Sequence, residues 1–131
     1  MIMSESRLKD LLDEAQVIQD FLEEPVNEEP NALSEKLSMM CVYMARSGNM
    51  LADAKYLQDV ERDKVFTEYY DEISSMPATI ASKLIDSKTS EVNYLVNWLE
   101  RINRACTHQA DSIRTIFSYV KENLKMTRNG Y

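Results

Sequence analysis

Apolar residues recur every three or four positions along most of this chain, which is the spacing of one face of an α-helix. The first such stripe predicts an amphipathic, mostly acidic helix over residues 4–23, capped by Ser4. Pro25 and Pro30 then interrupt the pattern, because proline lacks a backbone N–H and restricts the residue before it. Residues 24–30 are therefore predicted to be a polar linker.

The longest apolar pattern predicts a second helix over residues 31–73, with Asn31 as its N-cap. Its only interruption surrounds Gly48. A glycine costs about 1 kcal/mol relative to alanine in a helix interior, which is too little to break a helix that packs on both sides. We favour one long helix that can kink at this point, and the alternative is two helices joined at residues 47–49.

Two further helices are predicted in the C-terminal half. A short helix covers residues 77–86, a long one covers residues 90–125 without internal glycine or proline, and residues 126–131 form a frayed tail. Within the long helix a seam with steps of three and four continues over four heptads, as in coiled-coil packing. Its members are Val92, Leu95, Leu99, Ile102, Cys106, Gln109, Ile113, Ile116 and Val120.

Two features of this seam concern assembly. Gln109 is its one polar member, and such a residue commonly fixes register or oligomeric state, unless it only faces the wet end of a bundle. A second apolar set makes the surface too broad for one partner helix, so we expect its flank to contact either the first helix or a second subunit. That set contains Tyr94, Val96, Trp98, Ala105, Ala110, Phe117 and Tyr119.

These patterns predict an all-α fold in one domain, residues 1–131. We expect a helical bundle of about four helices in which two long, coiled-coil-like helices run antiparallel and the last one mediates homo-oligomer formation. The composition agrees, because 2 glycines and 3 prolines supply few turn formers for a many-stranded sheet.

The formal net charge of -7 opposes non-specific binding of nucleic acid over the whole surface. Basic residues nevertheless gather in the C-terminal third, which makes it the basic pole of an acidic protein. These residues are Arg101, Arg104, Arg114, Lys121, Lys125 and Arg128.

The two cysteines suggest a reducing compartment. Cys41 and Cys106 match no metal-ligand spacing and have apolar neighbours, so we expect two reduced, buried thiols in a cytoplasmic protein. The first residues lack the basic start and apolar run of a signal peptide, and no segment reaches the roughly 18 apolar residues of a membrane span. No membrane association is expected.

The only histidine is the obvious candidate for chemistry. Asp111 lies three residues after His108 and can reach it on a helix surface, but this spacing alone is a weak catalytic pattern. We interpret His108 as an exposed or interface residue. Arg104 is predicted to pair with Glu100 and Arg114 with Asp111 along the helix. The sequence contains no metal-binding or nucleotide-binding motif, so no metal, cofactor or catalytic residue is predicted.

Residues 46–57, "RSGNMLADAKYL", and 105–121, "ACTHQADSIRTIFSYVK", resemble small helical proteins encoded by bacteriophages and prophages. In that family the pattern S-G-x-x-L-A-x-A-K precedes the pattern T-H-Q-x-D-x-x-R-x-x-I-S. Ser118 agrees with the second pattern, whereas Phe117 replaces its usual isoleucine. The other matching residues are Ser47, Gly48, Leu51, Ala52, Ala54 and Lys55, followed by Thr107, His108, Gln109, Asp111 and Arg114. The resemblance implies a role in phage replication, recombination or host takeover, and it carries over no catalytic residue.

We therefore expect a non-enzymatic accessory protein, acting in host takeover or anti-defence by binding a host or phage protein. The alternative is a nucleic-acid or nucleotide binder that uses the basic face of the last helix, and a third hypothesis is an enzyme centred on His108 and Asp111. If the two long helices are antiparallel, residues near Gly48 are expected to lie opposite the C-terminal part of the last helix. The candidate binding residues are then Arg101, Arg104, His108, Asp111, Arg114 and Lys121, together with Asn49, Lys55 and Tyr56.

Overall fold

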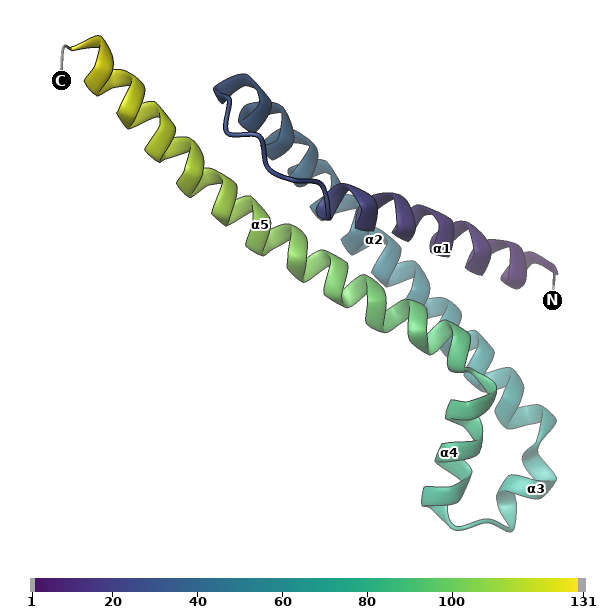
Figure 1. The fold of residues 1–131 in the computed structure, drawn as a ribbon. Helices are drawn as coiled ribbons and strands as arrows, with labels where there is room; N and C mark the ends of the chain where they lie inside the picture. Colours follow the sequence, from purple (N-terminus) through teal and green to yellow (C-terminus); the bar gives the residue numbers. More distant parts are fainter. Residues whose placement is uncertain (1, 130–131) are drawn as a thin grey trace.

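The computed structural model describes residues 2–129, with side chains from residue 5 onward, and this part of the chain forms five helices and no strand (Figure 1). The prediction of an all-α bundle with two long helices is confirmed. The helices are α1 (Ile2–Leu22), α2 (Pro30–Glu68), α3 (Tyr70–Ser74), α4 (Ala78–Lys88) and α5 (Ser90–Arg128).

The two long helices, α2 and α5, run antiparallel and share the most extensive packing in the molecule (Figure 1). Their direction is evident from two cross-helix hydrogen bonds. Gln58 Nε2 donates to Asn93 Oδ1 at 2.7 Å, and Asn103 Nδ2 donates to the Met44 carbonyl at 3.0 Å. The shared core comes mainly from the predicted apolar stripes, and its fully buried members include Leu33, Met40, Met50, Leu95, Leu99, Ile102, Cys106 and Ile113.

The flank of α5 is covered by α1, which decides between the first helix and a second subunit at this position. Leu11, Ala15 and Ile18 of α1 are buried in the common core. Two hydrogen bonds fix the contact: Trp98 Nε1 donates to Gln19 Oε1 at 3.1 Å, and Gln109 Nε2 donates to the Leu22 carbonyl at 2.9 Å. Gln109 therefore holds the C-terminal end of α1 against α5.

Gly48 does not interrupt α2, so the one-helix prediction is confirmed and the two-helix alternative is wrong. The helix begins at Pro30 because the side chain of Glu29, and not that of Asn31, accepts a hydrogen bond from the Ala32 amide at 3.0 Å. Its end also differs from the prediction. The backbone leaves the helical conformation at Tyr69, so α2 ends at Glu68 rather than at residue 73.

The C-terminal tail predicted for residues 126–131 is wrong over residues 126–128, because α5 continues to Arg128. Nothing before Gly130 opposes helix continuation, since no proline or glycine occurs in α5. Gly130 and Tyr131 lie outside the described residues. The short helix α4 extends two residues beyond the predicted end at 86.

Within residues 2–129, no helix combines the length and the apolar character that crossing a lipid bilayer requires.

Candidate functional site

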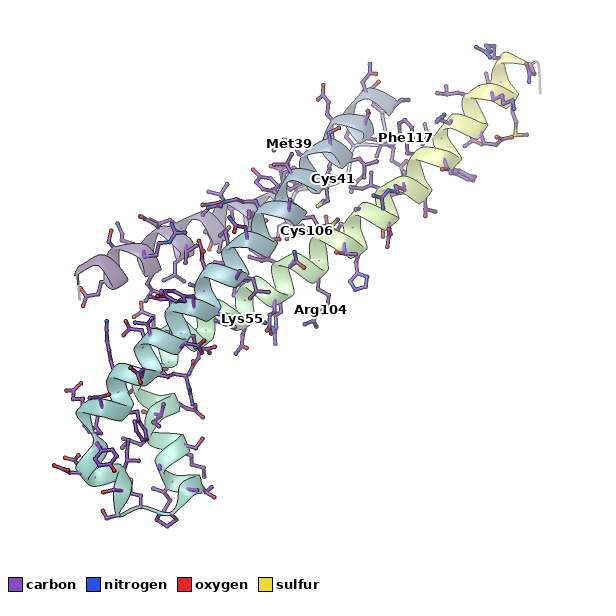
Figure 2. All side chains as sticks on the ribbon, turned by 180° about the vertical axis from the view of Figure 1, so that it is seen from behind. Met39, Cys41, Lys55, Arg104, Cys106 and Phe117 are labelled. Atoms are coloured by element: carbon purple, nitrogen blue, oxygen red, sulfur yellow. The ribbon has the colours of Figure 1, made fainter. Side chains whose placement is uncertain are left out.

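Four of the predicted binding residues form a ridge along the outer face of α5. Arg101, Arg104, His108 and Asp111 are three or four residues apart and all are exposed. Figure 2 shows Arg104 on the side of α5 that is turned away from α2. We call these four residues the outer ridge.

The basic side chains of the outer ridge have no hydrogen-bonding or ion-pair partner among the described residues. Glu100 was predicted to pair with Arg104, but its carboxylate lies 3.8 Å from Lys55 Nζ of α2 instead. Within the described part of the chain, Arg101, Arg104 and His108 consequently form no hydrogen bond or ion pair. The predicted pair of Arg114 and Asp111 is confirmed, at 2.9 Å between Nη1 and Oδ1.

The predicted convergence of the two long helices on one binding patch is wrong. The closest approach to a Cβ built on Gly48 is Asn103 Nδ2 at 3.6 Å, and Lys55 lies beside Glu100. The residues near Gly48 therefore face the first half of α5. Arg114 lies 11 positions beyond Asn103, about 16 Å farther along the helix axis.

The remaining candidates are consequently dispersed. Asn49 and Tyr56 are exposed on α2, and Tyr56 has 73% of its surface accessible. Arg114 and Lys121 are also exposed, on either side of Phe117 in the sequence, and Figure 2 places Phe117 near the N-terminal part of α2. Lys121 Nζ lies over the Phe117 ring, 5.6 Å from its centroid. Of these candidates, only Lys55 lies close to the outer ridge, because it contacts Glu100, the residue before Arg101.

A buried polar cluster joins the two long helices, and sequence reasoning missed its central residue. Asn103 Nδ2 donates to the Met44 carbonyl and to Ser47 Oγ, both at 3.0 Å, while Ser47 Oγ donates to the Met44 carbonyl at 3.1 Å. The available signal was position, because Asn103 lies three residues before Cys106, beside the apolar seam. Burial raises the pKa of the Cys106 thiol, against an opposing hydrogen bond with Ser47. A neutral buried thiol is chemically inert.

Cys41 was predicted to be buried, and this is wrong: Cys106 is buried but Cys41 is exposed (Figure 2). The physical reason is helical phase. Met40 faces the core with no accessible surface, so the next residue along α2 is turned about 100° away from it.

A shallow depression lies where the C-terminal part of α1 meets α5. Tyr94 and Trp98 line it as a tilted aromatic pair with ring centroids 5.7 Å apart, and Arg101 of the outer ridge borders it. Sequence reasoning assigned both aromatic residues to packing alone. The other lining residues are Gln19, Leu22, Glu23, Ala105 and Gln109.

The residues of the stretches 46–57 and 105–121 divide between packing and the surface. Ser47 and Ala54 are buried between α2 and α5, and Gln109 binds the end of α1. His108 and Asp111 are exposed on the outer ridge. The first stretch therefore holds the helices together, whereas the second contributes to both a packing face and an exposed face.

Among the described residues, no group of three or more histidine, cysteine, aspartate or glutamate side chains is arranged to hold a metal ion. Comparisons with known proteins give no match to a family model, a curated protein or a solved structure. A phage origin therefore stays a prediction from the sequence patterns in residues 46–57 and 105–121.

Proposed function

We propose that this chain is a non-enzymatic accessory protein of the phage type, which acts in host takeover or anti-defence by binding a partner protein and by self-association. The observation that carries the proposal is the outer ridge, where Arg101, Arg104 and His108 are exposed on a long helix and have no partner among the described residues. Arginine is enriched at binding hot spots, and its fork of donors suits a carboxylate.

The scaffold supports binding by a preorganised surface. The part of α5 that carries the outer ridge is packed against α2 and α1 on its other sides, so its backbone is already ordered. Binding on such a surface needs little further ordering of the chain, which lowers the entropic cost of association. Charge-assisted hydrogen bonds from the arginines would then position an acidic partner.

A nucleic acid or a nucleotide is the second candidate ligand. The same unpaired arginines favour it, and with Lys125 and Arg128 the positive side chains extend about 40 Å along α5. We favour a protein because the whole chain has a net charge of -7, and because Asp111 and Glu122 lie among these cations on the exposed side of α5. A polyanion would be repelled by these carboxylates.

The proposed location is the cytoplasm. The exposed Cys41 supports this proposal, because an unpaired surface thiol is chemically safest in a reducing compartment.

The experiment compares proteins captured by the full chain in expressing cells with those captured by the R101E/R104E variant. A control variant, K9E/K83E, makes the same charge change at exposed lysines of α1 and α4. We expect one defined protein to be retained by the wild type and the control and to be lost from R101E/R104E. Equal retention by all three would contradict the proposed surface.

A parallel titration tests the second candidate. Fluorescence anisotropy with short single-stranded and double-stranded oligonucleotides, at low and moderate salt, should give flat curves for the wild type. Binding that weakens steeply with salt and is lost in R101E/R104E would instead favour the nucleic-acid function.

A further inference from the structure

The C-terminal end of α5 extends past the rest of the molecule. Figure 1 shows it continuing beyond the loop between α1 and α2, and every residue from 121 to 129 is exposed. We call residues 121–128 the α5 tip. It is the end of the 39-residue helix α5 and spans about 12 Å along the helix axis.

An apolar stripe of α5 continues into the α5 tip, beyond the point where the stripe packs against the core. Ile113 is buried, Phe117 and Val120 are partly buried against the core, and Leu124 follows at the same helical spacing with 54% of its surface exposed. Met126, 46% exposed, is turned about 200° from Leu124 around the helix and lies outside this stripe. The stripe thus has the form of a contact face whose last turns lack a partner.

The α5 tip is positively charged. It contains Lys121, Lys125 and Arg128 against one carboxylate, Glu122. These three cations form no ion pair with any described residue. An apolar stripe bordered by cations fits a partner surface in which an apolar side chain is bordered by carboxylates.

The loop at residues 23–29 offers such a surface. It contains four glutamates and no cation, and every residue in it is exposed. Val26, near its centre, has 42% of its surface accessible. Glu29 caps α2, whereas the side chains of Glu23, Glu24 and Glu28 form no hydrogen bond or ion pair with a described residue.

We propose that the α5 tip of one copy docks on the 23–29 loop of a second copy. Tip and loop lie at the same end of the molecule (Figure 1), so two copies placed antiparallel and overlapping at these ends bring each tip to the other's loop. The same contact then forms twice about a twofold axis, giving a closed dimer. This inference deepens the proposed self-association and rests on it.

Charge decides against pairing of the two tips themselves. A tip-to-tip contact would bring Lys121, Lys125 and Arg128 of each copy together, and like charges across an interface disfavour association. In the tip-to-loop contact the cations face glutamates instead. Because exposed charges border a small apolar centre, we expect an affinity that weakens with salt.

The test exchanges the charges. The variant K121E/K125E makes the tip acidic. The variant E23K/E24K/E28K makes the loop basic, with three lysines against one glutamate, and leaves the Glu29 cap intact. Light scattering with size-exclusion chromatography should give twice the 15.2 kDa chain mass for the wild type and the monomer mass for each variant alone. An equimolar mixture should recover the dimer, because in the mixed pair both tip-to-loop contacts join opposite charges.

Two controls accompany this experiment. K9E/K83E should keep the wild-type mass, and L124A should weaken association at least tenfold while V17A, an exposed apolar residue of α1, leaves it unchanged. Circular dichroism confirms that all variants remain helical. Variants that stay dimeric alone, or a mixture that stays monomeric, would overturn the docking surface but leave self-association standing. A wild type that is monomeric at all concentrations would overturn both, leaving the outer ridge to its own experiment.

Discussion

Asn103 Nδ2 lies 3.0 Å from Ser47 Oγ, so a single amide on α5 is bound to a buried hydroxyl on α2. The same amide also donates to the Met44 carbonyl, and it lies beside Gly48. This cluster lies within the main packing surface of the two long helices. It fixes which residues of α2 face which residues of α5, and it thereby places the outer ridge and the α5 tip.

Replacing Asn103 by alanine should destabilise the fold by about 1–3 kcal/mol, because Ser47 would lose a partner in a buried setting. Urea denaturation followed by circular dichroism measures this. N97A, which alters an exposed asparagine of α5, should stay within about 0.5 kcal/mol of the wild type. The double variant S47A/N103A tests whether the two side chains act together. If its loss of unfolding free energy equals the sum of the losses in the two single variants, the side chains are not coupled.

Replacing Gly48 by alanine should stabilise the protein by about 0.5–1 kcal/mol. The added Cβ would meet only Asn103 Nδ2 at 3.6 Å, an ordinary van der Waals contact, and alanine is the better helix former. The reverse change at an exposed site of α2, A52G, serves as the matched control and should destabilise by a similar amount. A loss of stability in G48A would mean that the helices cannot tolerate a methyl group at this crossing.

The pair of Glu14 and Arg46 should make a small, pH-dependent contribution to stability. The hydrogen bond from Arg46 holds the pKa of Glu14 below its ordinary value of 4.5, so the contribution is present above that pH and disappears as the carboxylate protonates at lower pH. Both side chains are more than a third exposed, which limits the effect to about 1 kcal/mol. E14Q should therefore lower the unfolding free energy at pH 7, and should lower it by less at pH 3. If E14Q lowers the unfolding free energy equally at both pH values, the loss comes from packing and not from the ion pair. D13N, which changes an exposed carboxylate of α1, is the control.

The two thiols should differ sharply in reactivity. Cys41 is exposed, whereas Cys106 is buried and burial raises its pKa, which reduces the nucleophilic thiolate. A thiol reagent should modify one cysteine rapidly in the folded protein and the second only on unfolding, and C41S should abolish the rapid phase. Rapid modification of both cysteines in the folded wild type would contradict the buried position of Cys106.

Helix periodicity was sufficient to predict the architecture, because burial of an apolar stripe follows directly from spacing. It placed Leu95, Leu99, Ile102 and Ile113 in the core, where the structure has them. Spacing could not choose between partners that are equally near. Glu100 can reach Arg104 along its own helix or Lys55 across the interface, and only the register of α2 on α5 decides for Lys55.

Helix ends were harder to predict for a different reason. The break at Tyr69 coincides with no glycine or proline, so local propensity does not mark it. The sequence pattern also could not predict the register of α2 against α5. A seam of similar apolar residues fits several offsets, and at the offset seen here Asn103 binds Ser47. For that reason the predicted convergence of Asn49 and Tyr56 with Arg114 and Lys121 failed.

The central claim is that the outer ridge serves binding and not folding. The most direct measurement is the amount of partner protein retained by R101E/R104E relative to the wild type, at equal quantities of captured chain, with the unfolding free energy of both determined in parallel. The expected result is at least a tenfold loss of partner with an unfolding free energy within about 0.5 kcal/mol of the wild type, as for exposed side chains that form no hydrogen bond or ion pair. Undiminished retention of the partner, or loss of the partner only together with loss of the fold, would contradict the claim.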